Sequence, residues 1–148
     1  MSANQTIQPY LFFNGRCEEA MQFYKKALGA EVLFAMRYKE CPEPKPGMVP
    51  AGFENKIMHT TFQVGPNTLM ASDACSEDKV SYEGFSLSIS VGTEAEADRA
   101  FNALAEGGKV KMPLMKTFWS PRFGMLEDKF GIGWMVSVPG KDMPGAKK

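Results

Sequence analysis

The sequence predicts an α+β fold in which two βαβββ modules form a curved mixed sheet with a cleft, and both helices lie on the outer face. Three observations lead to this prediction. The order of one strand, one helix and three strands occurs twice along the 148 residues. Both predicted helices are amphipathic and end at glycine. Alternation of apolar and polar residues gives several strands one covered face and one open face.

The first module is predicted to cover residues 7–73. Its expected elements are a strand over 7–14, a helix over 17–28, and strands over 31–39, 56–64 and 68–73. The helix has an apolar stripe that includes Ala20, Met21 and Tyr24, and Gly29 is placed to end it. The turn residues Gly65-Pro66-Asn67 join the last two strands into a hairpin.

Residues 40–54 contain four prolines. Proline cannot donate to a sheet ladder, so this stretch is predicted to be a long surface loop instead of a central strand. Long loops in small domains are often lids or binding loops, and a simple connection is the alternative.

The second module is predicted to cover residues 85–138. Its expected elements are a strand over 85–91, a helix from about 93 to 106, and strands over 109–119, 122–128 and 133–138. Thr93 and Glu96 have the spacing of a capping box at the start of the helix, and Gly107-Gly108 ends it. A polar loop is expected over 74–84. Residues 1–6 and 139–148 are expected to be flexible, because they carry little apolar surface.

Composition excludes several classes of function. Seventeen basic and seventeen acidic residues balance, which argues against a nucleic-acid partner or a polybasic membrane surface. No apolar run reaches the roughly 18 residues of a membrane span. Cysteines 17, 41 and 75 lack a CxxC spacing and no secretory leader is visible, so a reduced, cytoplasmic protein is expected. A single histidine excludes sites built from several histidines of one chain.

The open faces of the predicted strands define a candidate ligand cleft. Alternation directs His59, Thr61, Gln63, Ser86, Ser88 and Met135 toward it, and Met70 with Phe118 or Trp119 is expected to add apolar wall. A few polar groups that converge in an apolar concavity are typical of a small-molecule site. Two alternatives remain: a cavity filled by its own side chains, and a sheet face covered by a partner subunit. The face of the first strand is left open, because both of its faces are apolar.

Four stretches of the chain show a family resemblance. They are PYLFFNGRCEEAMQFYKKALGAEV, KIMHTTFQVGPNTLMASDA, YEGFSLSISV and KTFWSPRFGMLEDKFGIGWMVSV. They resemble the PhnB-like proteins of the vicinal oxygen chelate superfamily, which includes glyoxalase I, extradiol dioxygenases, and bleomycin- and fosfomycin-resistance proteins. The resemblance implies a single domain of this type over residues 7–138, often assembled as a homodimer.

Metal-dependent members of the superfamily take four His or Glu ligands from their strands. Carried over position by position, these ligands fall at Pro9, Met70, Ser86 and Met135. Proline has no donor, and thioethers and neutral hydroxyls are poor ligands for Ni, Zn, Mn or Fe. The resemblance therefore implies a cleft without a metal, and no cofactor is expected.

The predicted function is that of a PhnB-like, glyoxalase-fold protein with degenerate metal ligands that binds a small organic molecule. One alternative is a metal-independent lyase or isomerase in which His59 is the acid or base, and Ser86, Thr61 or Gln63 holds an oxyanion. Another is a protein-interaction module. If the protein only binds a ligand, His59 has a structural or ligand-orienting role. A third possible role for His59 is that of a metal ligand.

Four further residues are candidates for a catalytic or orienting role. Asp73 either orients His59 or forms an Asx turn at a strand end. Glu127-Asp128 is interpreted as part of a turn that positions Trp134. A thiol dyad of Cys75 with His59 is conceivable. The methyltransferase label common among PhnB-like proteins is disfavoured, because Gly15 stands alone and no GxG motif precedes a helix.

Overall fold

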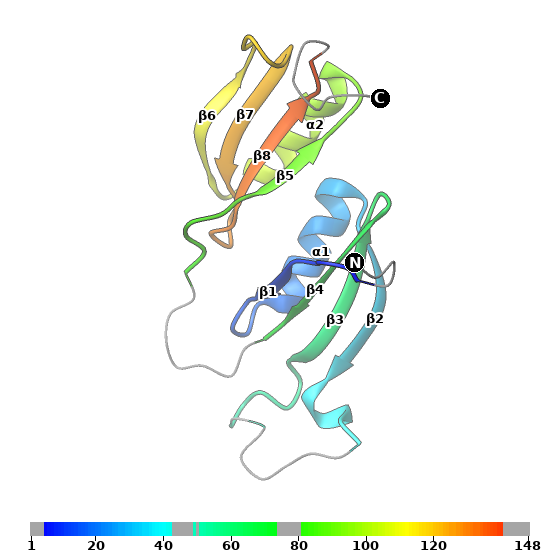
Figure 1. The fold of residues 1–148 in the computed structure, drawn as a ribbon. Coiled ribbons are helices and arrows are strands. Elements are labelled where there is room, and N and C mark those ends of the chain that lie inside the picture. The colour runs from blue at the N-terminus through cyan, green and yellow to red at the C-terminus, as the bar shows by residue number, and fades with distance from the viewer. Residues whose placement is uncertain (1–4, 43–48, 50, 74–80, 141–148) are drawn as a thin grey trace. The chain divides into compact units, whose positions relative to one another are not determined.

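The computed structural model describes residues 5–42, 49, 51–73 and 81–140. The chain divides into two compact units, residues 1–80 and 81–148, and each is described by itself below. Each unit is a four-stranded mixed sheet with one helix, so the predicted α+β fold of two βαβββ modules is confirmed (Figure 1). The expectations for residues 1–4, 43–48, 50, 74–80 and 141–148, with Cys75 among them, lie outside the described residues.

The first unit follows the predicted order of elements. They are β1 (Tyr10–Phe12), α1 (Cys17–Leu28), β2 (Glu31–Arg37), the 3₁₀ helix η1 (Tyr38–Glu40), β3 (Ile57–Val64) and β4 (Asn67–Ser72). The sheet order is β1-β4-β3-β2, with β1 parallel to β4 and the other pairs antiparallel. Val64 pairs with Asn67, which confirms the predicted hairpin.

Two strands of this unit are shorter than predicted. The strand expected over 7–14 pairs only at Tyr10–Phe12. The strand expected over 31–39 ends at Arg37, because Tyr38 turns into η1 and becomes buried. The Tyr38 hydroxyl donates a 2.7 Å hydrogen bond to the carbonyl of Asp73, a contact between distant segments that alternation cannot predict.

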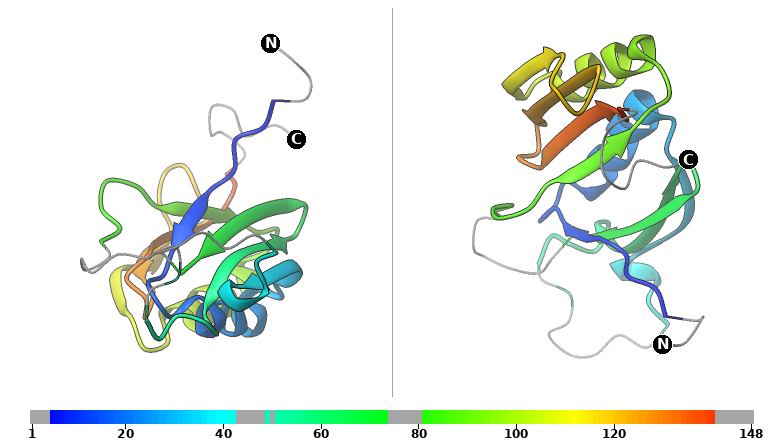
Figure 2. Two further views of the ribbon diagram at one scale, coloured as in Figure 1. Left: turned by 90° about the horizontal axis from the view of Figure 1, so that it is seen from below. Right: turned by 45° about the horizontal axis from the view of Figure 1, so that its top comes forward.

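Helix α1 covers one face of the first sheet (Figures 1 and 2). The Tyr24 ring stacks on Phe62 of β3 with a centroid separation of 6.2 Å. Ala20 is fully buried beside them, and its small side chain allows the helix to approach the sheet. As predicted, Gly29 ends the helix, in the left-handed conformation with φ 71°.

The start of α1 is capped by a residue from the far end of the unit. Arg16 occupies the N-cap position and makes no side-chain capping bond. Asp73 Oδ1 instead accepts hydrogen bonds from the amides of Gly15 at 2.6 Å and Cys17 at 2.8 Å. Asp73 Oδ2 accepts from the amide of Ile57 at 2.9 Å. A buried carboxylate therefore satisfies helix donors and fastens α1 to β3.

The same arrangement makes the Cys17 thiol unreactive. Burial raises its pKa well above the ordinary range, and the negative charges of Asp73 and Glu18 raise it further. The thiolate is the nucleophilic form, so Cys17 remains a protonated core residue at neutral pH.

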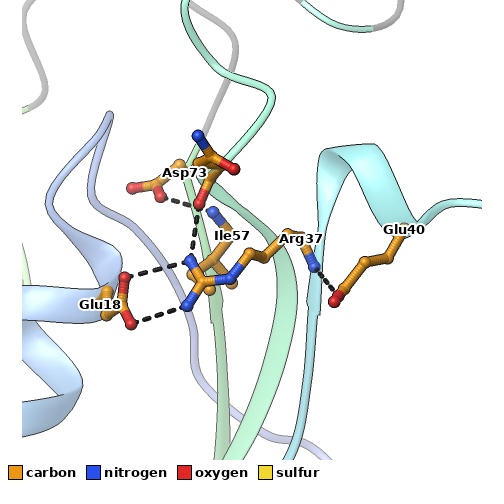
Figure 3. A network of polar contacts seen from close by, with 6 residues as sticks. Glu18, Arg37, Glu40, Ile57 and Asp73 are labelled. Atoms are coloured by element: carbon orange, nitrogen blue, oxygen red, sulfur yellow. Dashed lines mark hydrogen bonds and ion pairs between the residues drawn. The ribbon is translucent and has the colours of Figure 1, made fainter.

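An ion pair connects α1 to the end of β2. Arg37 holds Glu18 through two hydrogen bonds of 3.1 and 2.8 Å (Figure 3). It donates a third, 2.7 Å long, to the carbonyl of Asn55. The hydrogen bond from Arg37 lowers the pKa of Glu18 below its usual value, although partial burial opposes this. The Glu18 side chain is 56% exposed, which limits the contribution of the pair to stability.

Glu18→Gln should lower the free energy of unfolding at neutral pH by less than about 1 kcal/mol. Because the pKa of Glu18 is lowered in the folded state, the stabilisation is fully present above the ordinary carboxyl pKa. It is lost as the pH falls through the lowered value. Urea unfolding of both proteins between pH 7 and pH 3 should show their difference shrinking with acid. A difference that stays constant would contradict this, and the exposed substitution Glu106→Gln is the control.

The second unit repeats the arrangement. Its elements are β5 (Leu87–Ser90), α2 (Glu94–Ala105), β6 (Lys109–Met115), β7 (Arg122–Glu127) and β8 (Gly133–Val138). The sheet order is β5-β8-β7-β6, with β5 parallel to β8. Strand β6 ends at Met115, four residues before the predicted end, and a turn over residues 116–121 follows.

Helix α2 begins at the predicted capping box. Thr93 Oγ1 accepts from the amide of Glu96 at 3.1 Å, and Glu96 Oε1 accepts from the amide of Thr93 at 3.1 Å. The ring of Phe101 then packs over Gly124 of β7, where an added Cβ would lie 2.7 Å from a ring carbon. Glycine at position 124 therefore allows the close contact between helix and sheet.

Thr93→Ala should reduce the free energy of unfolding by about 1 kcal/mol, because it removes the acceptor for a helix amide. Thr93→Ser retains the hydroxyl and should stay within about 0.5 kcal/mol of the parent protein. Urea unfolding followed by circular dichroism measures both changes. Equal stability of the alanine variant and the parent would show that Glu96 alone suffices at this helix start.

The turn between β7 and β8 is organised by Asp128, as predicted. Its Oδ1 accepts from the amides of Phe130 at 2.9 Å and Ile132 at 3.1 Å. Its Oδ2 accepts from the Trp134 indole nitrogen at 2.9 Å. Asp128 is 3% exposed and thus has a structural role in positioning Trp134.

In the part of the chain that the structure describes, no helix is both long enough and apolar enough to cross a bilayer.

Candidate functional site

The face of the first sheet that points away from α1 forms a continuous surface. Tyr10, Met70, Thr61 and Phe34 are successive Cα partners across β1, β4, β3 and β2. Cross-strand partners point to the same side of a sheet, so these four side chains form one row. We call the surface formed by Tyr10, Phe12, Phe34, His59, Thr61 and Met70 the open face of the first sheet.

His59 lies at the centre of this face. Its Nδ1 is 3.0 Å from the Tyr10 hydroxyl oxygen, and its Nε2 is 3.3 Å from Thr61 Oγ1. The Tyr10 ring centroid lies 5.6 Å from the imidazole, and that of Phe34 lies 6.2 Å away. Hydrogen bonds at both nitrogens and rings on two sides fix the orientation of the imidazole.

The surroundings of His59 are apolar and accessible. Tyr10 is 36% exposed, Phe12 47% and Phe34 49%. The rings of Tyr10 and Phe12 are themselves in contact, with centroids 5.0 Å apart. Three neighbouring aromatic side chains that expose so much of their area are characteristic of a binding surface.

The nine predicted cleft residues are divided between the units. His59, Thr61 and Met70 lie on the open face of the first sheet, and Gln63, paired with Glu31, continues the same side of β3. The other five belong to the second unit: Ser86, Ser88, Phe118, Trp119 and Met135.

In the second unit, register brings two of these five residues together. Ser88 pairs with Met135, and Met125 and Met112 continue the row across β7 and β6. Ser86 precedes β5 and its hydroxyl lies beside Gly133, where an added Cβ would be 3.0 Å away. The open side of this sheet is therefore formed largely by methionine, an adaptable apolar side chain.

Phe118 and Trp119 lie in the turn after β6. Their rings are in edge-on contact with centroids 4.8 Å apart, and Phe118 is 93% exposed. With Lys116, Pro121 and Gly140 they line a hollow of about 340 Å³. They are thus part of a separate feature of the second unit and do not belong to the sheet row of Ser88 and Met135.

Sequence reasoning missed Tyr10, Phe12 and Phe34. The first strand is apolar on both faces, so alternation could not orient it. A bulge between Val32 and Phe34 also disturbs the alternation of β2. The pairing of Tyr10 with Met70 settles the register and places Tyr10, and not Pro9, beside Met70 on the open face. The sequence did hold one signal for this. Tyr10 and Phe12 are two positions apart, a spacing that places both rings on the same face of a strand.

The other catalytic hypotheses change accordingly. The Asp73 carboxylate accepts from Gly15, Cys17 and Ile57, so the idea that it orients His59 is wrong. The proposed dyad of Cys75 with His59 falls outside the described residues, because Cys75 is among those left undescribed.

The residues present do not fit a hard metal ion. Of the four positions carried over from the superfamily, Met70 and Met135 lie in strands, where their Cα partners are Tyr10 and Ser88. Pro9 and Ser86 precede β1 and β5. The side-chain donors of these residues are neutral hydroxyls and thioethers, which are poor ligands for Ni, Zn, Mn or Fe. Within the described residues, no three His, Cys, Asp or Glu side chains gather as a metal-binding group.

Comparison with known proteins identifies relatives over nearly the whole chain. The family model described as 3-demethylubiquinone-9 3-methyltransferase matches residues 5–137. Protein YjdN of Escherichia coli is 36% identical over 138 residues, which cover 89% of this chain and 94% of that protein.

Solved structures agree with this assignment. Protein PA1353 from Pseudomonas aeruginosa is 43% identical, with a TM-score of 0.81 over 93% of this chain and 100% of that one. The PhnB protein from Bacillus cereus is 32% identical, with a TM-score of 0.75 over 90% and 99%. The fold alone extends to the fosfomycin resistance protein FosX from Listeria monocytogenes, at 10% identity and a TM-score of 0.62 over 93% and 96%. The chain therefore belongs to the family described as 3-demethylubiquinone-9 3-methyltransferase, to which the PhnB protein from Bacillus cereus is also assigned.

Proposed function

We propose that this protein binds a small organic molecule on the open face of the first sheet, without a metal ion. One observation carries the proposal: His59 is held between Tyr10 and Thr61 on a surface that exposes three aromatic side chains. A few fixed polar groups within an apolar surface orient a ligand, while the apolar contacts supply binding energy.

The site is organised before any ligand arrives. The imidazole has a hydrogen-bond partner at each nitrogen, and the strands hold Tyr10 and Thr61 in register through Met70. Groups that are already ordered lose little conformational entropy on binding. This supports recognition of a defined ligand over nonspecific adsorption to an apolar patch.

The family description names methyl transfer, and the chain offers little support for that chemistry. The segment between β1 and α1 contains a single glycine, Gly15. Methyl donors of the adenosylmethionine type are generally held by a glycine-rich loop after the first strand of an α/β sheet. We therefore propose binding as the function that the site supports best.

A second function, acid or base catalysis by His59, is favoured by one observation. Tyr10 and Thr61 present hydroxyls on either side of the imidazole, and these could relay a proton to or from a bound molecule. For such an enzyme, His59→Gln should abolish turnover and leave ligand binding largely intact. Loss of both together would support a ligand-orienting role.

A fragment screen tests the proposed function directly. His59 is the single histidine of the chain, so its ring proton Hε1 gives one NMR signal without assignment ambiguity. We expect members of a small-fragment library to shift this signal, and to raise the Tm by an amount that grows with ligand concentration. Binding should weaken in Tyr10→Phe, which removes the hydroxyl but retains the ring.

If no fragment moves either the His59 signal or the Tm, the proposed function fails, and the interaction-module alternative gains support. The Val110→Ala variant is a control, because Val110 is 50% exposed on β6 of the second unit. Its response to fragments should match that of the parent protein.

We also propose that the chain forms a homodimer, as the superfamily resemblance implies. The edge strand β2 supports this, because Val32 is 44% and Leu33 is 50% exposed there. Light scattering coupled to size-exclusion chromatography should report twice the 16.4 kDa chain mass. A monomer at micromolar concentration would contradict the proposal.

A further inference from the structure

We infer that the ligand of the open face is an uncharged aromatic molecule that carries a hydroxyl group. The inference rests on the proposed function and adds to it the chemical class of the ligand. Three features of the described residues support it: the near absence of charge, the hydrogen-bond capacity of the His59 triad, and the aromatic border.

Charge is scarce on this sheet. The charged residues in strands β1 to β4 are Glu31 and Arg37. Arg37 is already held by Glu18 and donates to Asn55. Glu31 pairs with Gln63 at the opposite end of the β2–β3 ladder from His59. An ammonium ligand would therefore lose its hydration without gaining an opposite charge, and so would a carboxylate beside a neutral imidazole.

The triad of Tyr10, His59 and Thr61 has a fixed hydrogen-bond capacity. With a neutral imidazole, each of the three residues brings one polar hydrogen, and the two contacts within the triad use two of them. If Nε2 carries the proton, Tyr10 donates to Nδ1 and the Thr61 hydrogen is free. If Nδ1 carries it, Thr61 donates to Nε2 and the Tyr10 hydrogen is free.

In either tautomer, one of the two hydroxyls, that of Tyr10 or that of Thr61, has a hydrogen left to donate. The oxygen of the other hydroxyl has lone pairs left to accept. A hydroxyl group both donates and accepts, so it can bind at either end without leaving a polar group unsatisfied. A carboxylate accepts only and an ammonium donates only, so each matches one end at most.

The aromatic border, formed by Tyr10, Phe12 and Phe34, favours a flat ligand. Phe34 and Tyr10 lie on two sides of the imidazole, with centroids 6.2 and 5.6 Å away, and Phe12 adjoins Tyr10 at 5.0 Å. Aromatic rings favour tilted or offset contacts at such separations. A flat ring that lies over this border gains these contacts, whereas a saturated ring of the same size gains less.

Four probes of matched size separate these requirements. The first, 2-naphthol, carries all the required features, and naphthalene lacks the hydroxyl. In 2-naphthoate a charged carboxylate replaces the hydroxyl, and trans-2-decalol keeps the hydroxyl but has no aromatic ring. Titration at neutral pH, followed by the His59 Hε1 signal, gives a Kd for each. We expect 2-naphthol to bind at least about tenfold more tightly than each of the others, a ratio worth about 1.4 kcal/mol.

Variants assign the effect to the residues. Tyr10→Phe should reduce the preference for 2-naphthol over naphthalene, because only the Thr61 end then keeps its hydroxyl. Phe34→Leu should reduce the preference over trans-2-decalol. Phe85→Leu is the matched control, because Phe85 is also 49% exposed but precedes β5 in the second unit. It should leave all four affinities unchanged. Circular dichroism verifies that each variant is folded.

The outcomes distinguish this inference from the proposed function. Equal or tighter binding of 2-naphthoate or trans-2-decalol overturns the ligand class, while binding at His59 still supports the function. Equal binding of naphthalene overturns the hydroxyl requirement. If none of the probes binds but other library fragments shift the His59 signal, the class is wrong and the function stands. If no compound of either set binds, both are wrong.

Discussion

Asp73→Ala should destabilise the protein by about 3–5 kcal/mol, because it leaves three backbone amides, two of them buried, without an acceptor. The lost contacts are those to Gly15, Cys17 and Ile57, and Asp73 itself is 1% exposed. That loss is a large fraction of the 5–15 kcal/mol typical of a folded domain. Urea unfolding followed by far-ultraviolet circular dichroism measures it.

The control substitution lies at the start of the same helix. Glu19 is 49% exposed and pairs with Arg16 across one turn, so Glu19→Ala should cost less than about 1 kcal/mol. If Asp73→Ala costs no more than Glu19→Ala, the carboxylate does not hold α1 against β3.

A second readout shows whether the two units unfold together. Both tryptophans, Trp119 and Trp134, belong to the second unit, whereas Asp73 belongs to the first. Tryptophan fluorescence therefore follows the second unit, and circular dichroism follows both. If Asp73→Ala shifts the dichroism midpoint but not the fluorescence midpoint, the units unfold separately. A common shift shows one cooperative transition.

Asp128→Ala should destabilise the second unit by about 3 kcal/mol. It removes the acceptor for the amides of Phe130 and Ile132 and for the indole of Trp134. Ile132 is fully buried and Trp134 is 6% exposed, so water cannot replace the lost bonds without local opening. Fluorescence-detected urea unfolding should show the lower midpoint, and native emission should shift to longer wavelength as Trp134 gains solvent.

Two further substitutions test the role of each Asp128 oxygen. Asp128→Asn keeps one acceptor for the backbone amides but turns an amide group toward the Trp134 donor, so about half of the loss should remain. Glu127→Ala, beside it, removes only a partly exposed carboxylate 3.9 Å from Lys109 and should cost less than about 0.5 kcal/mol. Equal effects of Asp128→Ala and Glu127→Ala would contradict the role given to Asp128.

The helices and their ends could be read from the sequence because their signals are local. Gly29 ends α1 and the Thr93–Glu96 box begins α2 through contacts within a few residues. The turn at Asp128 was predictable for the same reason, since Trp134 is only six residues away. The strand ends at Phe12, Arg37 and Met115 were less predictable, because pairing partners from elsewhere in the chain determine them.

The residues of the candidate site also differ in whether local sequence patterns or contacts between distant strands place them. Alternation placed His59 and Thr61 on one face of β3, and this is a property of any extended strand. It could not bring in Tyr10, which lies 49 residues from His59, or Phe34, which follows a bulge. Those contacts depend on the register between strands.

The sequence thus determined the two repeated modules, both helices and the polar face that carries His59, since periodicity and helix signals act between neighbours in the chain. Tertiary structure decided that Tyr10 reaches His59 and that Asp73 caps α1 across 56 residues. The physical reason is that a register shift of one residue would turn Tyr10 to the opposite face of β1, and only the packed sheet determines that register.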